Sequence, residues 1–327
     1  MKKLAAVVLA AAVALSAAGC SKEDENGPYT VNDTVEWTVT SSPGGGSDVF
    51  SRMIADIMIS EDMVNGEAVV ITNKTDGNGE IGRHEIAHLK GPKVNRSLIT
   101  FNSGDLMPMV QITKNRSENF RMLAIMAVDK QLLFKGTATK YTDFAEAIEA
   151  AKNGTRIVIG GSKGDDVATY NALIEELGIS RDLMTFITYS SSSDAITAAL
   201  GGHVEFVISK PASASEYVTA GSLIPVLALA NQRYGGNLSE APTLSEIGDY
   251  NNVEVPVWRG VAASENMSDS AVEYWSDILK RVSETEKWKT EYLDKYMLIG
   301  DFKGAQEATE YVAQYEADYL ESIEKSE

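Results

Sequence analysis

Several loops in this sequence combine glycine with serine, asparagine or aspartate, and the first of them is Pro43-Gly44-Gly45-Gly46-Ser47-Asp48. An alternating, β-branched run precedes this loop and apolar residues at helical spacing follow it, so it is expected to join a strand to a helix. Glycine allows a tight turn and brings bare N–H groups close to a ligand. The helix start adds unpaired N–H donors and the positive end of the helix dipole. The stretch therefore predicts an anion-binding site, with a simple capped turn as the alternative.

Later loops have a similar composition and also lie between an expected strand and an expected helix. The residues that these loops offer to a ligand are Asn102, Ser103, Ser162, Lys163, Gly164, Asp165, Ser190, Ser191 and Ser209. The serine run at 190–193 has no His–Asp partnership that would support nucleophilic catalysis. The chemistry indicated is therefore non-covalent binding of a small polar ligand, with no catalytic residue and no cofactor.

The segment His84-Glu85-Ile86-Ala87-His88 matches a zinc-protease motif, in which two histidines bind the metal and the glutamate is a general base. It lies in an expected helix, but a catalytic zinc needs a third protein ligand. Val94 stands where an extended motif has its next histidine, and His203 belongs to a distant segment. Glu118 is a further candidate, but it follows no clear helix. A secreted zinc hydrolase is kept as the alternative function, and two polar residues on a helix surface are the simpler interpretation.

Two other motifs come from one glycine-rich turn. Gly77-x-Gly79-x-x-Gly82 matches the dinucleotide fingerprint by letter, but it lies four residues beyond the strand end, and no acidic residue ends the next strand. The neighbouring Asp76, Asn78 and Glu80 lack the spacing of a calcium loop. A ligand-binding or structural loop explains the same residues.

The polar loops require an α/β framework. Strands are expected at 35–40, 68–72, 97–101, 122–128, 132–134, 156–159, 185–189 and 204–208, with helices after most of the loops. Repeated strand–loop–helix units predict parallel sheets, whose ligands bind beyond the carboxyl ends of the strands. Two rounds of such units predict two lobes that face each other across a cleft. The apolar run 224–230 could return the chain to the first lobe, and helices rich in Glu and Lys are expected over 269–326.

Composition limits the ligand and the compartment. The chain has 327 residues, a formal net charge of −18 and no basic patch, which argues against nucleic acid as a partner. Residues 1–19 have a basic start, a short apolar run and small residues, which is typical of a secretory signal peptide. Cys20, the only cysteine, follows Ala-Ala-Gly as in a bacterial lipobox, where it becomes the lipid-modified first residue. Residues 20–29 then form a tether, and internal disulfides are excluded.

These segments together resemble the substrate-binding proteins of tripartite tricarboxylate transporters, also called Bug receptors. The resemblance covers roughly residues 35–315 and rests on the order and spacing of many short motifs. They are the loop Pro43 to Asp48 with Arg52, Val70 to Lys74 with Ile81-Gly82, Gly160-Gly161-Ser162 with Gly164, Thr188-Tyr189, Leu200 to Glu205, Ala220 to Leu223, Ala241 to Gly248, and Trp258-Arg259-Gly260.

The resemblance implies a two-lobed, type II periplasmic-binding-protein fold with the ligand cleft between the lobes. Lobe 1 would comprise residues 30–127 and 229–327, and lobe 2 residues 128–228. Such a receptor captures a small solute, usually a carboxylate, and delivers it to a separate membrane permease; it is expected to be monomeric and extracytoplasmic.

By family analogy, the loops Gly44 to Asp48 and Ser162 to Asp165 embrace opposite ends of the ligand through N–H groups, hydroxyls and ordered water. The loops at Asn102 and Ser190 complete the pocket, and Asp48 orients a water or caps the helix. Where the family often has Tyr-Lys-Gly, this chain has Tyr189-Ser190-Ser191, which removes a positive charge. Lys163 could restore that charge, although Asp165 and Asp166 stand beside it. An amino acid, or a neutral or zwitterionic solute, therefore stays open beside a dicarboxylate.

Overall fold

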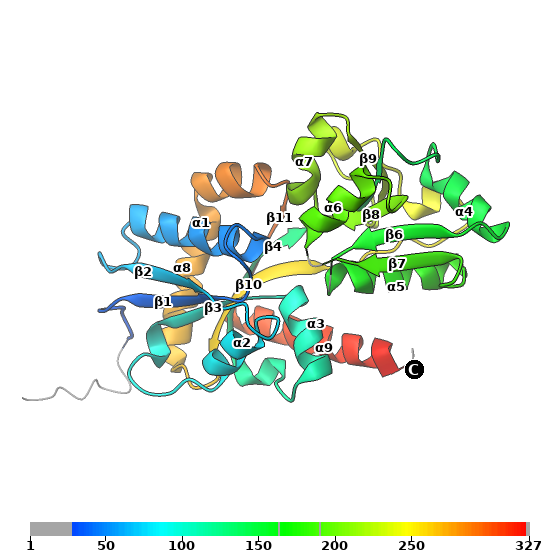
Figure 1. The fold of residues 1–327 in the computed structure, drawn as a ribbon. Helices are drawn as coiled ribbons and strands as arrows, with labels where there is room; N and C mark the ends of the chain where they lie inside the picture. The colour runs from blue at the N-terminus through cyan, green and yellow to red at the C-terminus, as the bar shows by residue number, and fades with distance from the viewer. Residues whose placement is uncertain (1–27, 163, 190, 325–327) are drawn as a thin grey trace, which may run out of the picture.

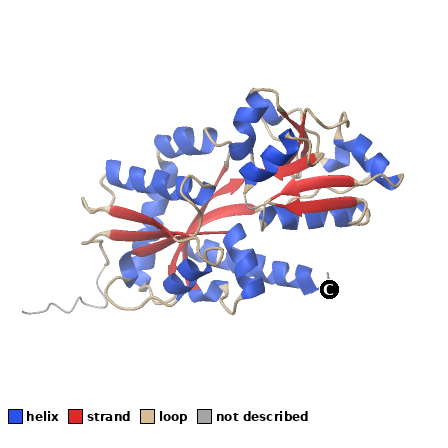
Figure 2. Cartoon of the chain, viewed as in Figure 1, coloured by secondary structure: helices blue, strands red, loops and turns tan. Residues whose placement is uncertain are grey.

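The chain forms two lobes, each built on one β-sheet with helices packed against it (Figures 1 and 2). The structure is a computed structural model, and it describes residues 28–162, 164–189 and 191–324. The predicted signal peptide, Cys20 and most of the tether lie outside the described residues, as do Lys163 and Ser190.

The first lobe contains both ends of the described chain. Its strands are β1 (Val35–Val39), β2 (Val69–Asn73), β3 (Ser97–Asn102), β4 (Phe120–Asp129), β10 (Val257–Ser264) and β11 (Ile299–Gly304). Its helices are α1 (Gly46–Ser60), α2 (Glu80–Ala87), α3 (Ser103–Ile112), α8 (Asp269–Glu284) and α9 (Ala305–Glu324), with a π-helical segment at Trp288–Asp294. The strand order is β11-β4-β10-β3-β1-β2.

Alternation along the strands supplies the two apolar faces of this sheet. In β3, Leu98 packs into a core with α1 and α8, and its neighbour Ile99 packs on the opposite face with α2, α3 and α9. In β1, the buried Trp37 donates its indole N–H to the Thr100 hydroxyl at 2.9 Å, so its one polar atom is satisfied in the interior.

The second lobe is formed by the middle of the chain. Its strands are β5 (Leu132–Gly136), β6 (Ile157–Gly161), β7 (Met184–Thr188), β8 (Phe206–Ser209) and β9 (Leu223–Ala228), in the order β7-β6-β8-β5-β9. Its helices are α4 (Phe144–Lys152), α5 (Asp165–Leu177), α6 (Ser192–Leu200) and α7 (Pro211–Thr219). The chain passes between the lobes twice, from β4 to β5 and from β9 to β10.

The structure corrects three expectations about the strands. The sheets are mixed: β1 is parallel to β2 and β3, and β6 is parallel to β7 and β8, but β5, β10 and β11 pair antiparallel. The run expected to return to the first lobe instead contains β9, which pairs with β5 in the second sheet. Strands β10 and β11 were not predicted. Arg259 interrupts the apolar pattern of β10, and β11 has two glycines and two charged residues among its six positions.

Candidate functional site

The loop that opens α1 is held in place by Asp48. This buried carboxylate accepts hydrogen bonds from the Gly44 N–H at 2.8 Å, Arg52 Nε at 2.9 Å and Asn73 Nδ2 at 3.0 Å. Burial alone would raise the pKa of Asp48, but the bonds from Arg52, Gly44 and Asn73 lower it below the usual value. Gly44 adopts φ +80°, which favours glycine. Asp48 therefore shapes the loop, while no side chain caps the N-terminus of α1.

The sequence analysis did not identify Arg259 as a site residue, yet it lies beside the start of α1. A Cβ atom on Gly46 would fall 2.7 Å from one guanidinium nitrogen of Arg259, so glycine permits this close approach. Arg259 Nη2 lies 2.7 Å from Asp129 Oδ2, and the Asp129 side chain is only 1% exposed. Burial opposes the charged form of Arg259, but Asp129 keeps its pKa above the usual value. The first turn of α1 thus faces a permanent cation.

The loop after β3 is hydrogen-bonded to the loop that opens α1. Asn102 donates its side-chain N–H to the Ser47 hydroxyl at 3.0 Å, and its side-chain oxygen caps α3 by accepting the Asp105 N–H at 3.1 Å. Asn102 therefore aligns the loops that follow β1 and β3. In the first lobe, the predicted residues Gly44 to Asp48 and Asn102 do come together, and Arg259 is added to them.

The opposing loop of the second lobe is organised by Asp166. Its carboxylate accepts hydrogen bonds from the Ser162 N–H at 2.8 Å and the Ser162 hydroxyl at 2.6 Å, and Lys210 Nζ lies 2.7 Å away. Gln131, on the connection between the lobes, donates to the same carboxylate at 3.1 Å. Burial lowers the pKa of Lys210, but Asp166 and Asp165 outweigh this and raise it. Lys210 therefore stays charged and forms ion pairs with the carboxylates of both Asp165 and Asp166.

Ser191 and Ser209, two further residues predicted to contact the ligand, have structural roles in the second lobe. Ser191 caps α6 by accepting the Asp194 N–H at 3.2 Å. Ser209 ends β8, opposite Leu132 in the sheet, and is fully buried. Lys163 and Ser190, also predicted to contact the ligand, lie outside the described residues. The family analogy for all four remains a prediction.

The two lobes touch where α3 and α5 begin. Ser103 of the first lobe donates its hydroxyl to Asp165 Oδ1 of the second lobe at 2.6 Å. A Cβ atom on Gly164 would lie 3.4 Å from Gly104 Cα, so the two backbones also approach closely. Burial raises the pKa of Asp165 above its usual value, against the opposing effect of Lys210. We call the Ser103–Asp165 pair the interlobe bridge.

Replacing Ser103 by alanine removes the donor of the interlobe bridge. A hydrogen bond to a carboxylate contributes about 1.5–3 kcal/mol, so we expect solute binding to weaken about tenfold or more, because closure loses this contact. Isothermal titration calorimetry measures the affinity, and small-angle X-ray scattering measures the opening of the lobes. Ser283→Ala removes a serine hydroxyl bond on the exposed surface of α8 and serves as the control. An unchanged affinity in Ser103→Ala would show that the bridge does not contribute to closure.

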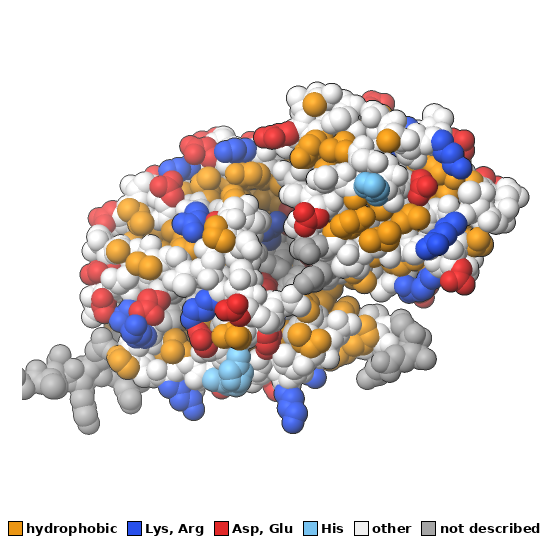
Figure 3. Space-filling view, viewed as in Figure 1, with side chains coloured by type: hydrophobic (Ala, Val, Ile, Leu, Met, Phe, Trp, Pro, Cys, Tyr) orange, Lys and Arg blue, Asp and Glu red, His pale blue; other side chains and the backbone are white. Residues whose placement is uncertain are grey.

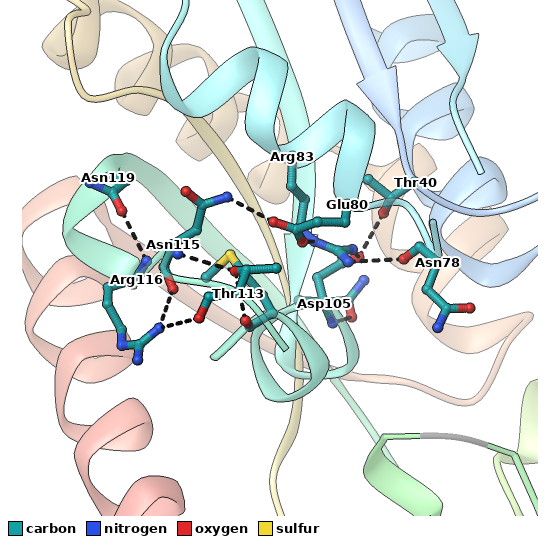
Figure 4. A network of polar contacts seen from close by, with 11 residues as sticks. Thr40, Asn78, Glu80, Arg83, Asp105, Thr113, Asn115, Arg116 and Asn119 are labelled. Carbon is teal, nitrogen blue, oxygen red and sulfur yellow. Dashed lines mark hydrogen bonds and ion pairs between the residues drawn. The ribbon is translucent and has the colours of Figure 1, made fainter. Parts of the chain in front are cut away.

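The second glycine-rich turn is built around Arg83, which is 1% exposed (Figure 4). Arg83 pairs with Glu80 at 2.9 Å and with Asp105 at 2.8 Å, and it donates to the Asn78 carbonyl at 2.9 Å. Asp105 also accepts from Thr40 at 2.6 Å. These contacts occupy the Glu80 carboxylate and the Asn78 carbonyl, two of the groups that had suggested calcium, and they explain the glycine pattern without a nucleotide. The turn is a structural link between α2, α3 and the end of β1.

The zinc motif finds no third metal ligand in the described part of the chain. His84 and His88 have ring centroids 4.5 Å apart on α2, while Glu85 pairs with Lys74 and Glu265 lies 3.9 Å from His88 Nδ1. Among the described residues, no group of three His, Cys, Asp or Glu side chains could hold a metal ion. The simpler interpretation of two polar residues on a helix surface accounts for the motif.

The model of the tripartite tricarboxylate transporter family receptor matches residues 51–323. The chain belongs to this receptor family. Receptors of this family lie outside the cytoplasm, bind small carboxylate solutes and work with a membrane permease. The family predicted from the sequence motifs is thereby confirmed. None of the helices in the described part of the receptor has the length and apolar character to cross a membrane.

Solved structures show the same fold as the receptor. A solute-binding protein from Polaromonas without ligand is 22% identical, with a TM-score of 0.68 and coverage of 90% of the receptor and 98% of that chain. MatC from Rhodopseudomonas palustris with bound malate is 19% identical, with a TM-score of 0.73 and coverages of 90% and 98%. An R. palustris protein with adipate is 18% identical, with a TM-score of 0.75 and coverages of 88% and 95%. No curated protein sequence matches the receptor. The two-lobed periplasmic-binding-protein fold is confirmed.

Proposed function

We propose that the receptor holds a carboxylate group of its solute at the start of α1, against the first-turn N–H groups, the Ser47 hydroxyl and the Arg259 guanidinium. The observation that carries this proposal is the close approach of Arg259 to Gly46 at a helix start that no side chain caps. Helix N-termini attract anions, and a guanidinium fits a carboxylate with two parallel hydrogen bonds. Similar structures hold malate and adipate, which are both dicarboxylates.

The second lobe would hold the other end of the solute through Ser162, Lys163, Gly164, Ser190 and Ser191. The charge of this end limits the negative charge that the solute can bring to it. In the contacts described above, the three carboxylates of Asp129, Asp165 and Asp166 are balanced by two cations, Arg259 and Lys210. Burial raises the pKa of Asp165 above its usual value, and Lys210 Nζ, 3.6 Å from Asp165 Oδ2, offsets part of the repulsion between this carboxyl and a second anionic group of the solute. A dicarboxylate is the first choice, and an amino acid is the second.

In this function the receptor catalyses no reaction. Solute binding shifts an equilibrium between open and closed lobes, because the closed arrangement makes more contacts with the solute. The lobes correspond to residues 30–127 with 229–327 and to residues 128–228. We place the monomeric receptor outside the cytoplasmic membrane, anchored through a lipid on Cys20, where it delivers its solute to a tripartite-type permease.

A thermal-shift screen of the purified receptor tests the proposed solute class. The panel contains C4 to C6 dicarboxylates, the matching monoamides and uncharged diamides, and zwitterionic amino acids. A dicarboxylate should raise the melting temperature, because a ligand at about one hundred times its Kd adds about 2.7 kcal/mol to the free energy of unfolding. The monoamide should also bind, since the α1 site needs one carboxylate. A response only to solutes without a carboxylate would refute the proposal.

A further inference from the structure

A second hollow adjoins the solute site, with which it shares Gly164, and extends along the side of the molecule where α5 faces α9. It has a volume of about 840 Å³, within the range of small-molecule sites. Its walls are α3 and α9 of the first lobe, α5 of the second lobe, and residues 254–256 of the connection between β9 and β10. Figure 3 shows hydrophobic side chains over α3 and α9 below the second lobe. We call this hollow the α5–α9 groove.

The α5–α9 groove has a row of aromatic rings on one wall. Tyr311, Tyr315 and Tyr319 recur every four residues on α9, so they share one face of the helix. Tyr311 and Tyr315 stack with centroids 6.3 Å apart, and Tyr315 meets the edge of Trp258 at 5.9 Å. All three tyrosines pack against the apolar core of the first lobe. They are therefore held in place. Lys303 Nζ already lies 5.4 Å from the centre of the Tyr311 ring, so a ligand has the exposed ring surfaces of Tyr315 and Tyr319.

The charge of the groove is negative. Glu175, Glu254 and Asp318 line it, and all three are exposed residues. Asn231 donates to Glu254, and Gln314 donates to Asp318 at 2.7 Å, so the partners found for these two carboxylates are neutral amides. Among the described residues that line the groove, none is Lys or Arg. Arg181, in the adjoining hollow, already donates to Asn171 at 2.8 Å and lies over the Tyr170 ring.

Aromatic faces and carboxylates together select one class of ligand. The face of a tyrosine ring carries negative potential and attracts an organic cation, and a carboxylate strengthens that attraction. The apolar lining, which includes Met107, Val167 and Pro256, favours a hydrocarbon body attached to the cation. A dicarboxylate, which suits the Arg259 site, would be repelled here.

We propose that the α5–α9 groove is a second ligand site, specific for an arylalkyl ammonium ion. The ring of this ligand lies against the tyrosines of α9 and its ammonium group lies among Glu175, Glu254 and Asp318. The groove is lined by both lobes, and its Tyr315 neighbours Ser103 and Asp165 of the interlobe bridge. Occupancy therefore favours the closed lobes and tightens binding at the α1 site, since coupling between two sites is reciprocal.

Titration calorimetry of the purified receptor with 2-phenylethylammonium and with neutral 2-phenylethanol tests the second site. The ammonium ion should bind with one-to-one stoichiometry and about tenfold or more tightly than the alcohol, because cation–π contacts add about 0.5–2 kcal/mol and the carboxylates add to this. Glu254→Gln and Asp318→Asn should each weaken the ammonium ion and leave the alcohol unchanged. Glu307→Gln, an exposed carboxylate of α9 outside the groove, is the control and should bind as the parent does.

The second-site proposal would be overturned by equal affinities for the two probes, by no binding of either probe, or by ammonium binding that Glu254→Gln and Asp318→Asn do not change. The result does not depend on the proposed solute, because Arg259→Gln should leave ammonium binding intact. If that variant abolishes it, the probe occupies the α1 site and the second-site proposal is wrong. A failed solute screen combined with retained ammonium binding would refute only the function proposed for the α1 site.

Discussion

Replacing Arg83 by methionine is expected to lower the free energy of unfolding by about 3–5 kcal/mol, because it leaves a buried carboxylate without its cation. Arg83 contacts Asp105, Glu80 and the Asn78 carbonyl, and one oxygen of Asp105 already lacks a hydrogen-bond partner. Urea unfolding followed by circular dichroism measures the change. Arg121→Met is the matched control, since Arg121 pairs at the surface with the exposed Asp269 and such pairs contribute about 0–1 kcal/mol.

The pH dependence of the Arg83→Met variant tests the cause. Burial raises the pKa of Asp105 above 3.8 even with Arg83 present. Below its unfolded pKa the carboxyl is protonated in both states and needs no partner. The penalty appears as the pH rises through the folded pKa, so the gap between parent and variant should be large at pH 7 and shrink toward pH 4. A gap that is constant over this range would show that lost packing, not the charge of Asp105, causes the effect.

Replacing Arg259 by glutamine should weaken carboxylate binding by about 10- to 100-fold, since hydrogen bonds to charged groups contribute about 1.5–3 kcal/mol. The variant keeps a similar side-chain shape but loses the charge beside Gly46. Calorimetry with the dicarboxylate found in the screen measures the change. Because Asp129 is almost fully buried and would be left unpaired, some stability should also be lost.

Two further variants separate binding from folding at Arg259. The double variant Asp129→Asn with Arg259→Gln removes both charges, so it should recover most of the stability and still bind weakly. Asp129→Asn alone frees the guanidinium and should bind the carboxylate at least as well as the parent does. If Arg259→Gln binds the carboxylate with the parent affinity, then Arg259 does not contact the solute. Its role would then be structural, through its ion pair with Asp129 at the end of β4.

The loops of the first lobe could be predicted because their signals are local. Gly44 needs a positive φ, and Asp48 and Asn102 bond to N–H groups within four residues of themselves. Such preferences depend on the nearest neighbours in the chain, so strand, loop and helix were expected close to their observed bounds. The sequence also contained a sign that Arg259 is buried and paired, because it is a charged residue within the apolar stretch around Trp258. No neighbouring residue in the chain indicated that Asp129 is its partner.

The residues that complete the site depend on strand order. Arg259 reaches α1 because β10 inserts antiparallel between β3 and β4, and Asp129 meets it from the end of β4. The antiparallel direction could not be inferred from strand–helix units, which favour parallel sheets. The α9 tyrosines likewise belong to a stretch that was expected only to form helices rich in Glu and Lys, and only the placement of α5 opposite them encloses a groove.

By itself, the sequence determined the type of fold, the family and the loops that carry backbone donors, because short-range conformational preferences and the order of the motifs are written along the chain. The tertiary structure alone decided which distant polar groups meet: the ion pairs of Arg259 with Asp129 and of Lys210 with Asp166, and the hydrogen bond of Ser103 to Asp165. Ionic side chains lose their hydration on burial and therefore require partners, and the partner is whichever group the packing of sheets and helices brings within reach.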